Sequence, residues 1–330
     1  MKEFSRMLAW AAIGGMCLAA SVPVATAADA YDKYPEKPVR FIVPFPPGAL
    51  NDFLGRVLAA KLSETWKRST VVDNRAGGNT IIGTDMAAKA PPDGYTLFLC
   101  SFATAVNQSL YAKLPYDPNK DFAFVTLVAS SPYILVVQAS LPAKSLAELV
   151  TLARAKPGQI NYGSTGNGGT SNLMGEMLKS MAKIDLVHVP YKGLAPVISD
   201  MLGGQINMSF GSYSTVSPHL KSARLRGLAV TSVKRSAYTP DMPSIAESGY
   251  PGYEADPWWG ITVPAGTARA LIARLNRDIV RVLQAPDVMD KLQGAGIEIV
   301  TSTPERFAAY FASEVVRWGK VVREAGVKAD

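Results

Sequence analysis

Short apolar runs alternate with amphipathic stretches along most of this chain, and no other feature restricts its fold as strongly. The first apolar run, Val39–Val43, ends at a proline-rich segment over residues 44–48. Beyond it, Leu54, Leu58 and Leu62 recur at the spacing of one helix face. Strands that alternate with helices form βαβ units around a mainly parallel sheet. The pattern therefore predicts an α/β fold.

The same alternation continues towards the C-terminus. Further strands are predicted at Ser69–Val72, Tyr95–Cys100, Ile160–Gly163, Leu186–Val189, Ile206–Phe210, Leu225–Val230 and Gly260–Val263. Helices are predicted at Ile81–Ala90, Leu146–Ala155, Ser171–Met181, Ala195–Leu202, Thr267–Leu283 and from the capping sequence at Ser302 to Arg323. A chain of this length suits one large domain or two lobes of about 150 residues.

Two extended segments, Phe124–Val137 and Leu228–Val233, have the length needed to run between two lobes. If both do so, residues 28–131 and 232–330 together form one lobe, and residues 132–231 form the other. Periodicity reports only local structure. It does not decide between this arrangement and a single domain.

The N-terminal residues read as an export signal. Lys2 and Arg6 precede the apolar run Met7–Ala20, and Ala25–Ala27 offers the small residues of a cleavage site. A membrane anchor is the alternative, but a spanning helix needs about 20 apolar residues. We predict that residues 1–27 are a signal peptide cleaved near Ala27, and that the mature protein lies in the periplasm.

The charge pattern argues against a nucleic-acid partner. The formal net charge is +7, but the basic residues are dispersed, and Lys234–Arg235 is about their longest cluster. A nucleic-acid surface would gather them on one face or one helix. A mild positive field suits small anions instead.

The residues that usually carry catalysis are scarce. Beyond the predicted signal the only cysteine is Cys100, inside a predicted strand, which favours a buried structural thiol. His188 and His219 have no metal-ligand spacing to each other or to Cys100. There is no phosphate-binding loop and no nucleophile elbow, and the glycines from Gly163 to Gly168 have the reverse of dinucleotide-binding spacing. We therefore expect no cofactor, no metal and no enzyme activity.

Three loops follow predicted strands and precede predicted helices: Pro46–Asp52, Ser164–Thr170 and Tyr191–Gly193. In open α/β sheets, ligands bind beyond the carboxyl ends of the strands. A helix start presents free amide groups that receive carboxylates well. The alternative is that these loops are only well-capped turns. Asp52 in particular has the position of a helix cap as well as that of a ligand-binding group.

Eight short stretches, in order along the chain, carry a family resemblance. They are Tyr34–Pro38, Val43–Gly48, Asp73–Gly78, Pro92–Tyr95, Asn161–Ser164, His188–Gly193, Leu228–Thr231 and Pro264–Thr267. On these residues the chain resembles the solute receptors of tripartite tricarboxylate transporters, the TctC-like or Bug-type periplasmic receptors.

The resemblance implies a type II periplasmic-binding-protein fold, with two α/β lobes, two crossing strands and a ligand cleft between them. It implies a receptor that closes on a small organic acid and delivers it to a membrane permease. We also predict a monomer, and, because Leu50 would add an apolar wall to the pocket, a mono- or dicarboxylate with an aliphatic or aromatic body. Two other functions stay open: a periplasmic hydrolase or transferase on a two-lobed scaffold, and a ligand-sensing module.

Carried over by position, the resemblance implies the ligand-binding residues. They are Gly48, Ala49, Leu50, Asn51, Asp52, Ser164, Thr165, Gly168, Gly169, Thr170, Ser171, Tyr191 and Lys192, with Ser101 and Ser212 as weaker candidates. Many family members have small residues and Thr-Asp where this chain has Gly48–Asp52, which puts citrate in doubt as the ligand. Leu50 either narrows the pocket or turns into the core. Trp258 and Trp259 line the cleft or pack in the core.

Overall fold

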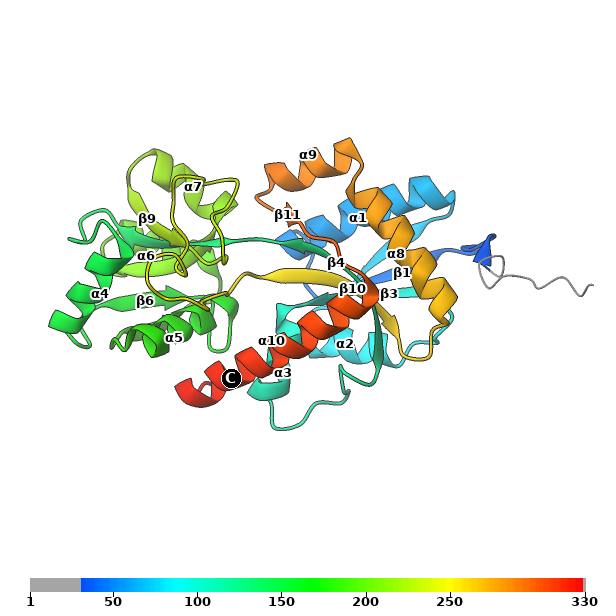
Figure 1. Ribbon diagram of the computed structural model, residues 1–330, viewed down its shortest axis with the longest axis horizontal. Coiled ribbons are helices and arrows are strands. Elements are labelled where there is room, and N and C mark those ends of the chain that lie inside the picture. Colours follow the sequence, from blue (N-terminus) through cyan, green and yellow to red (C-terminus); the bar gives the residue numbers. More distant parts are fainter. Residues whose placement is uncertain (1–30, 329–330) are drawn as a thin grey trace, which may run out of the picture.

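The computed structural model of the protein describes residues 31–328. The predicted signal peptide, residues 1–27, lies outside the described residues. Within them the chain forms two sheets, each flanked by helices, that lie side by side as two lobes (Figure 1). Lobe 1 is the six-stranded sheet with its helices, and lobe 2 is the five-stranded sheet with its helices. The predicted α/β fold is confirmed.

The sheet of lobe 1 has the order β11-β4-β10-β3-β1-β2. Its strands are β1 (Val39–Val43), β2 (Thr70–Asn74), β3 (Thr96–Ser101), β4 (Phe122–Ser130), β10 (Trp258–Pro264) and β11 (Glu298–Ile299). Its helices are α1 (Leu50–Trp66), α2 (Ile81–Ala88), α3 (Phe102–Leu110), α8 (Arg269–Leu283), α9 (Pro286–Gly294) and α10 (Pro304–Ala325). β1 runs parallel to β2 and β3, so β1 and β3 end at the same edge.

The sheet of lobe 2 has the order β7-β6-β8-β5-β9. Its strands are β5 (Tyr133–Gln138), β6 (Asn161–Ser164), β7 (Val187–Pro190), β8 (Met208–Ser212) and β9 (Leu225–Val230). Its helices are α4 (Leu146–Ala155), α5 (Thr170–Ala182), α6 (Leu194–Leu202) and α7 (Tyr213–Lys221). β6 runs parallel to its neighbours β7 and β8, while β5 is antiparallel to β8 and β9.

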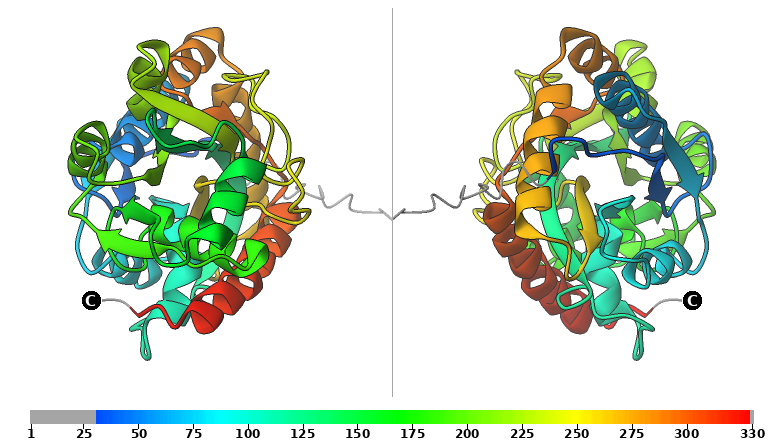
Figure 2. Two further views of the ribbon diagram at one scale, coloured as in Figure 1. Left: turned by 90° about the vertical axis from the view of Figure 1, so that its left-hand side faces the viewer. Right: turned by 90° about the vertical axis from the view of Figure 1, so that its right-hand side faces the viewer.

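Side-chain alternation along the strands places apolar residues on both faces of the lobe 1 sheet. In β3, Leu97 and Leu99 join the cluster that contains α1 residues, whereas Phe98 and Cys100 join the cluster that contains residues of α3 and α10. Successive strand residues point to opposite faces, so each lobe needs helices on both sides of its sheet. The two end views show this layering (Figure 2).

The chain runs between the lobes at two places in the sequence. β4 ends at Ser130 in lobe 1 and β5 begins at Tyr133 in lobe 2. The return path begins after β9, which ends at Val230, and finishes at β10. The finer division, residues 28–131 with 232–330 against 132–231, stays a prediction.

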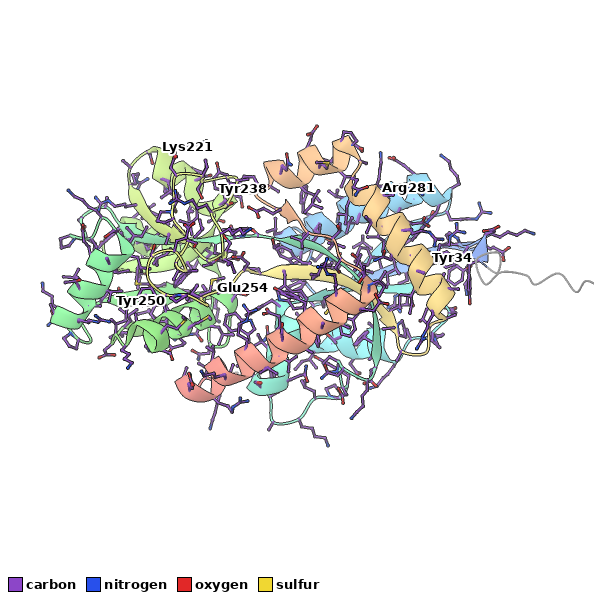
Figure 3. The ribbon with its side chains drawn as sticks, viewed as in Figure 1. Tyr34, Lys221, Tyr238, Tyr250, Glu254 and Arg281 are labelled. Atoms are coloured by element: carbon purple, nitrogen blue, oxygen red, sulfur yellow. The ribbon has the colours of Figure 1, made fainter. Side chains whose placement is uncertain are left out.

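The segment between β9 and β10, residues 231–257, contacts both lobes. Its Ile245 amide donates to the Val230 carbonyl of β9 at 2.9 Å. Its Tyr238 hydroxyl donates to the Ile297 carbonyl of lobe 1, also at 2.9 Å. Tyr238 and Glu254 of this segment lie where the lobes face each other (Figure 3). α10 also reaches across, since Ser180 of α5 donates to Glu324 at 3.2 Å.

Candidate ligand-binding site

A cavity of about 240 Å³ lies between the lobes and takes its walls from both. Lobe 1 contributes Phe45, Asn51, Asn79, Ser101, Phe102, Ala103, Val106, Trp258 and Trp259, and lobe 2 contributes Tyr133, Thr165, Gly168, Gly169 and Thr170, with Pro257 on the connecting segment. Pockets of roughly 300–1,000 Å³ hold drug-sized ligands. This smaller volume suits one small organic molecule.

Three helices begin at the cavity. Asn51 is the second residue of α1, Ser101 precedes α3, and Thr170 is the first residue of α5. The first amides of a helix lack partners within the helix and carry a partial positive charge. The N-caps of α1 and α5, Ala49 and Gly169, make no side-chain hydrogen bond to these amides. None of the described residues that line the cavity is charged, so the partial positive charge at these helix starts is the backbone's own contribution to the cavity.

The loop between β6 and α5 is held in shape by its own hydrogen bonds. Ser171 Oγ accepts from the Thr165 amide at 3.0 Å, and Asn172 Oδ1 accepts from the Gly168 amide at 3.0 Å. The Gly169 amide donates to the Gly166 carbonyl at 3.1 Å. This loop brings Thr170, the first residue of α5, to the cavity wall.

Gly168 of this loop meets lobe 1 directly. Its φ of +68° lies in the left-handed region, and a Cβ built on it would lie 2.9 Å from Leu110 Cδ1 of α3. Glycine is the residue that adopts this φ at little cost. The positive φ therefore favours glycine here, and a Cβ would require the Leu110 side chain of the other lobe to shift.

Ser164 and His188 form a serine–histidine pair beside the cavity. Ser164 Oγ lies 2.6 Å from His188 Nε2, and burial lowers the pKa of His188, which favours the neutral ring. Ser164 is fully buried and does not line the cavity. Its hydroxyl also donates to the Gly166 carbonyl at 3.2 Å, and its oxygen accepts from the Gly166 amide at 3.1 Å. The pair thus braces the β6–α5 loop and offers no exposed nucleophile.

Asp52 has a similar bracing role in the loop between β1 and α1. Its buried carboxylate accepts hydrogen bonds of 2.9 Å from the Gly48 amide, Arg56 Nε and Asn74 Nδ2. Burial alone would raise the pKa of Asp52, but these three hydrogen bonds outweigh it and lower the pKa. All three hydrogen bonds of the carboxylate are to the protein itself. Asp52 is the third residue of α1 and not its cap, since Ala49 is the N-cap, so the predicted helix-capping role is wrong.

Aromatic and apolar side chains form much of the remaining wall. They are Phe45, Phe102, Val106, Tyr133, Trp258 and Trp259. Trp259 Nε1 donates to Asn51 Oδ1, and Trp258 Nε1 donates to the buried Glu314 carboxylate at 2.7 Å. Hydrogen bonds from the indole N–H groups therefore hold both tryptophans in place. Each packs in the core and also lines the cavity.

Six of the predicted ligand-binding residues line the cavity and nine do not. Those that line it are Asn51, Ser101, Thr165, Gly168, Gly169 and Thr170; those outside it are Gly48, Ala49, Leu50, Asp52, Ser164, Ser171, Tyr191, Lys192 and Ser212. Leu50 packs against the core of lobe 1. The Tyr191 hydroxyl donates to Asp200 at 2.6 Å, and Ser212 Oγ shares a 2.8 Å hydrogen bond with Thr215. Lys192 is exposed.

Sequence reasoning missed the residues that α3 and the connecting segments bring to the cavity: Phe45, Asn79, Phe102, Ala103, Val106, Tyr133 and Pro257. The sequence did contain a feature that predicts some of these residues. β3 is parallel to β1 and ends at the same edge, so the rule that selected the loop after β1 also selects the residues after β3.

The described residues offer neither a reactive thiol nor a metal site near the cavity. Cys100 is a free, buried thiol, and burial raises its pKa to about 12, which keeps it protonated and unreactive. Within residues 31–328, no three His, Cys, Asp or Glu side chains are grouped closely enough to hold a metal ion. No helix of this described part is long and apolar enough to cross a membrane.

The chain is similar in sequence and in structure to known proteins. The family described as "Tripartite tricarboxylate transporter family receptor" matches residues 54–327. The chain is similar to Protein BugT of Bordetella pertussis, with 38% identity over 90% of this chain and 92% of that protein. It is also similar in structure to Rpa4515 of R. palustris with adipate (TM-score 0.76, 35% identity, 89% of this chain and 99% of that one). MatC of Rhodopseudomonas palustris with bound malate is a further neighbour (TM-score 0.73, 27% identity, 88% and 100%).

Proposed function

The chain belongs to the tripartite tricarboxylate transporter family of periplasmic receptors, and we propose that it holds the carboxylate of a small organic acid on main-chain amides and hydroxyls between its two lobes. The resemblance stated from the sequence, and the type II periplasmic-binding-protein fold that it implies, are confirmed by this membership. The observation that carries the proposal is the uncharged cavity at which α1, α3 and α5 begin.

A carboxylate fits the polar part of this cavity. Helix N-termini bind anions through free amides and a favourable dipole. Hydrogen bonds to an ionised group are about twice as strong as those between neutral groups. The Thr170 amide and hydroxyl, at the start of α5, would face the carboxylate from lobe 2. The start of α1 at Asn51 would face it from lobe 1.

The apolar part of the cavity supports a ligand with a hydrocarbon body. Phe45, Val106 and Tyr133 would remove such a body from water, which contributes about 25 cal/mol per Å². Two relatives are described with adipate and with malate. An acid of four to six carbons also suits the size of this cavity. The receptor would deliver it to a tripartite tricarboxylate-type permease in the membrane.

The same receptor would act as a single chain that closes on its ligand and releases it unchanged. Both walls of the cavity come from one copy of the chain, so a second copy adds nothing to the site. Two lobes joined through two connections can hinge about them. Export through residues 1–27, with cleavage near Ala27, would place the receptor with its permease.

Native mass spectrometry of protein purified from cells without denaturation tests the proposal. We expect an adduct whose mass is that of a small organic acid, displaced by an excess of adipate. After incubation, the acid should be recovered chemically unchanged. Recovery of a hydrolysed or transferred product would contradict the receptor function and favour a periplasmic hydrolase or transferase. Identical small-angle scattering profiles with and without saturating acid would contradict hinge closure.

A further inference from the structure

Asn107 of α3 has a fully buried side-chain amide that makes three hydrogen bonds to a loop outside its own helix. The residue is 0% exposed. Its Nδ2 donates to the Asn79 carbonyl at 2.6 Å and to Thr80 Oγ1 at 3.4 Å, and its Oδ1 accepts from Asn79 Nδ2 at 2.8 Å. A buried amide needs such partners, because burying its polar atoms without them is unfavourable. The two residues that provide them belong to the loop between β2 and α2.

This loop has an unusual backbone. Its residues Gly77, Gly78, Asn79 and Thr80 have four consecutive positive φ angles, +125°, +54°, +48° and +77°. Glycine adopts such angles at little cost and asparagine tolerates them, but a β-branched threonine does so only under strain. A strained backbone of this kind persists only where the surrounding structure fixes it. The three hydrogen bonds from Asn107 fix it at the two residues that are not glycine.

The loop contributes to the cavity, whereas Asn107 does not. Asn79 is one of the residues that line the cavity, and Asn107 lies behind the wall. α3 is held in place independently of the loop, since the Phe102 ring contacts the Trp318 ring of α10 edge-on, with 4.7 Å between the ring centroids. If the hydrogen bonds of Asn107 were lost, the loop would therefore move and α3 would stay.

The same hydrogen bonds also fix the orientation of the Asn79 side chain. Asn107 Nδ2 donates to the Asn79 carbonyl, so Asn107 Oδ1 is the atom that faces the Asn79 amide. An oxygen with no hydrogen needs a donor, and only the nitrogen of that amide can supply one. Rotating either amide by half a turn would bring two oxygens or two nitrogens together. Asn79 is therefore held in one orientation at the cavity wall.

We propose that Asn107 is a positioning residue for ligand binding: it holds residues 77–80 in their left-handed conformations and thereby keeps Asn79 at the cavity wall in the orientation that the ligand meets. The inference rests on the proposed function, since Asn79 lines the cavity in which the organic acid is proposed to bind. Asn107 acts on the ligand only through this loop.

A double-mutant cycle measured by titration calorimetry tests the proposal. The probes are adipate and malate, the acids of the two related structures. Asn107→Ala and Asn79→Ala should each weaken binding by about tenfold, since either change removes Asn79 from its place in the wall. The double variant should bind no more weakly than either single variant, because residues that act through one contact are not additive.

Asn276→Ala is the matched control. Asn276 of α8 also holds distant backbone through its side-chain amide, since its Nδ2 donates to the Val125 and Ser302 carbonyls, both at 2.8 Å. It lies outside the cavity lining. Asn276→Ala and Asn107→Ala should both lower Tm, because each removes hydrogen bonds that hold lobe 1 together. Only Asn107→Ala should also lose affinity, which a purely structural role would leave unchanged.

Gly77→Ala tests the same loop without altering Asn107. Gly77 is exposed, its φ of +125° disfavours any other residue, and a Cβ built on it would lie 2.6 Å from Ile82 Cδ1. The loop should shift, and affinity should fall by about tenfold in wild type but by less than about twofold when Asn79 is already alanine. This variant gives the answer even if Asn107→Ala does not fold.

Four outcomes would overturn the inference: wild-type affinity in folded Asn107→Ala, wild-type affinity in Asn79→Ala, additive losses in the double variant, or an equal loss of affinity in Asn276→Ala. In each of them wild-type protein still binds an acid, and the proposed function survives. If wild-type protein binds neither probe nor any acid recovered with it from cells, the proposed function fails and this inference fails with it.

Discussion

Thr231 Oγ1 donates a hydrogen bond of 2.6 Å to Asp256 Oδ1, and the same oxygen accepts one of 2.8 Å from the Tyr133 amide. Tyr133 begins the strand that follows the first passage between the lobes, and Asp256 lies just before β10 on the return. One threonine hydroxyl therefore joins the two connections between the lobes.

Stability should depend on pH through Asp256. Burial raises its pKa to about 7; the Thr231 hydrogen bond opposes this, while Glu298, Glu254 and Glu314 add to it. Because the folded pKa lies above the ordinary value of 3.8, the contribution is fully present below about pH 4 and is lost as the pH rises through 7. Asp256→Asn, which keeps an acceptor for Thr231, should raise Tm by about 2 °C at pH 8 and leave it unchanged near pH 4.

Melting curves from pH 4 to pH 8 measure this difference. Asp290→Asn, at an exposed position of α9, is the control and should shift Tm equally at all pH values. A constant offset for Asp256→Asn across the range would show that its carboxyl does not titrate there.

Gly168→Ala should weaken ligand binding by about tenfold, because a new Cβ meets Leu110 and hinders the approach of the lobes. Gly326→Ala is the matched control, since Gly326 has nearly the same φ, +63°, but no atom within 4 Å of a new Cβ. Both variants should lose some stability through backbone strain. Only Gly168→Ala should lose affinity in calorimetry, and adding Leu110→Ala should restore part of it. Equal affinities in all variants would contradict the contact.

Thr170→Ala should weaken binding of the organic acid by about tenfold, since it removes a hydroxyl donor at the start of α5. Lys192→Ala should change the affinity by less than about twofold, because Lys192 is exposed and outside the cavity lining. Ser164→Ala should act indirectly, by loosening the loop that Ser164 and His188 brace. Titration calorimetry on the three variants measures these changes in affinity. Loss of binding in Lys192→Ala alone would exclude a site made of amides and hydroxyls.

Acids with an aliphatic or aromatic body, such as adipate, benzoate and phthalate, should bind more tightly than citrate. Citrate brings a hydroxyl and a third carboxylate into an uncharged cavity with aromatic walls, and burying such groups without partners costs a few kcal/mol. A competition panel followed by calorimetry measures the order. Leu50→Ala should lower Tm without changing that order, because Leu50 packs against the lobe 1 core. Citrate displacing every other acid would contradict the prediction.

Much of the fold could be predicted from the sequence. The predicted strand Tyr95–Cys100 corresponds to β3, and the predicted helix Ser171–Met181 corresponds to α5 within one residue at each end. Both rest on local rules, since alternation and helical spacing act over neighbouring residues. α3 was missed. Its length is not the reason, since α2 and α6 are no longer than α3 and were predicted. Its buried residues include the polar Thr104 and Asn107, so apolar spacing does not mark its buried face.

The sequence by itself determined the alternation of strands and helices and which loops follow strands and precede helices, because those features depend on residues close together in the chain. Only the tertiary structure decided which polar groups in those loops remain free for a ligand. Asp52 is occupied by Gly48, Arg56 and Asn74, whereas Ser101, beside Trp259 of a distant strand, keeps a hydroxyl without a partner. A buried polar group is satisfied by whatever the fold places next to it, and strand pairing over more than 150 residues is not written in local periodicity.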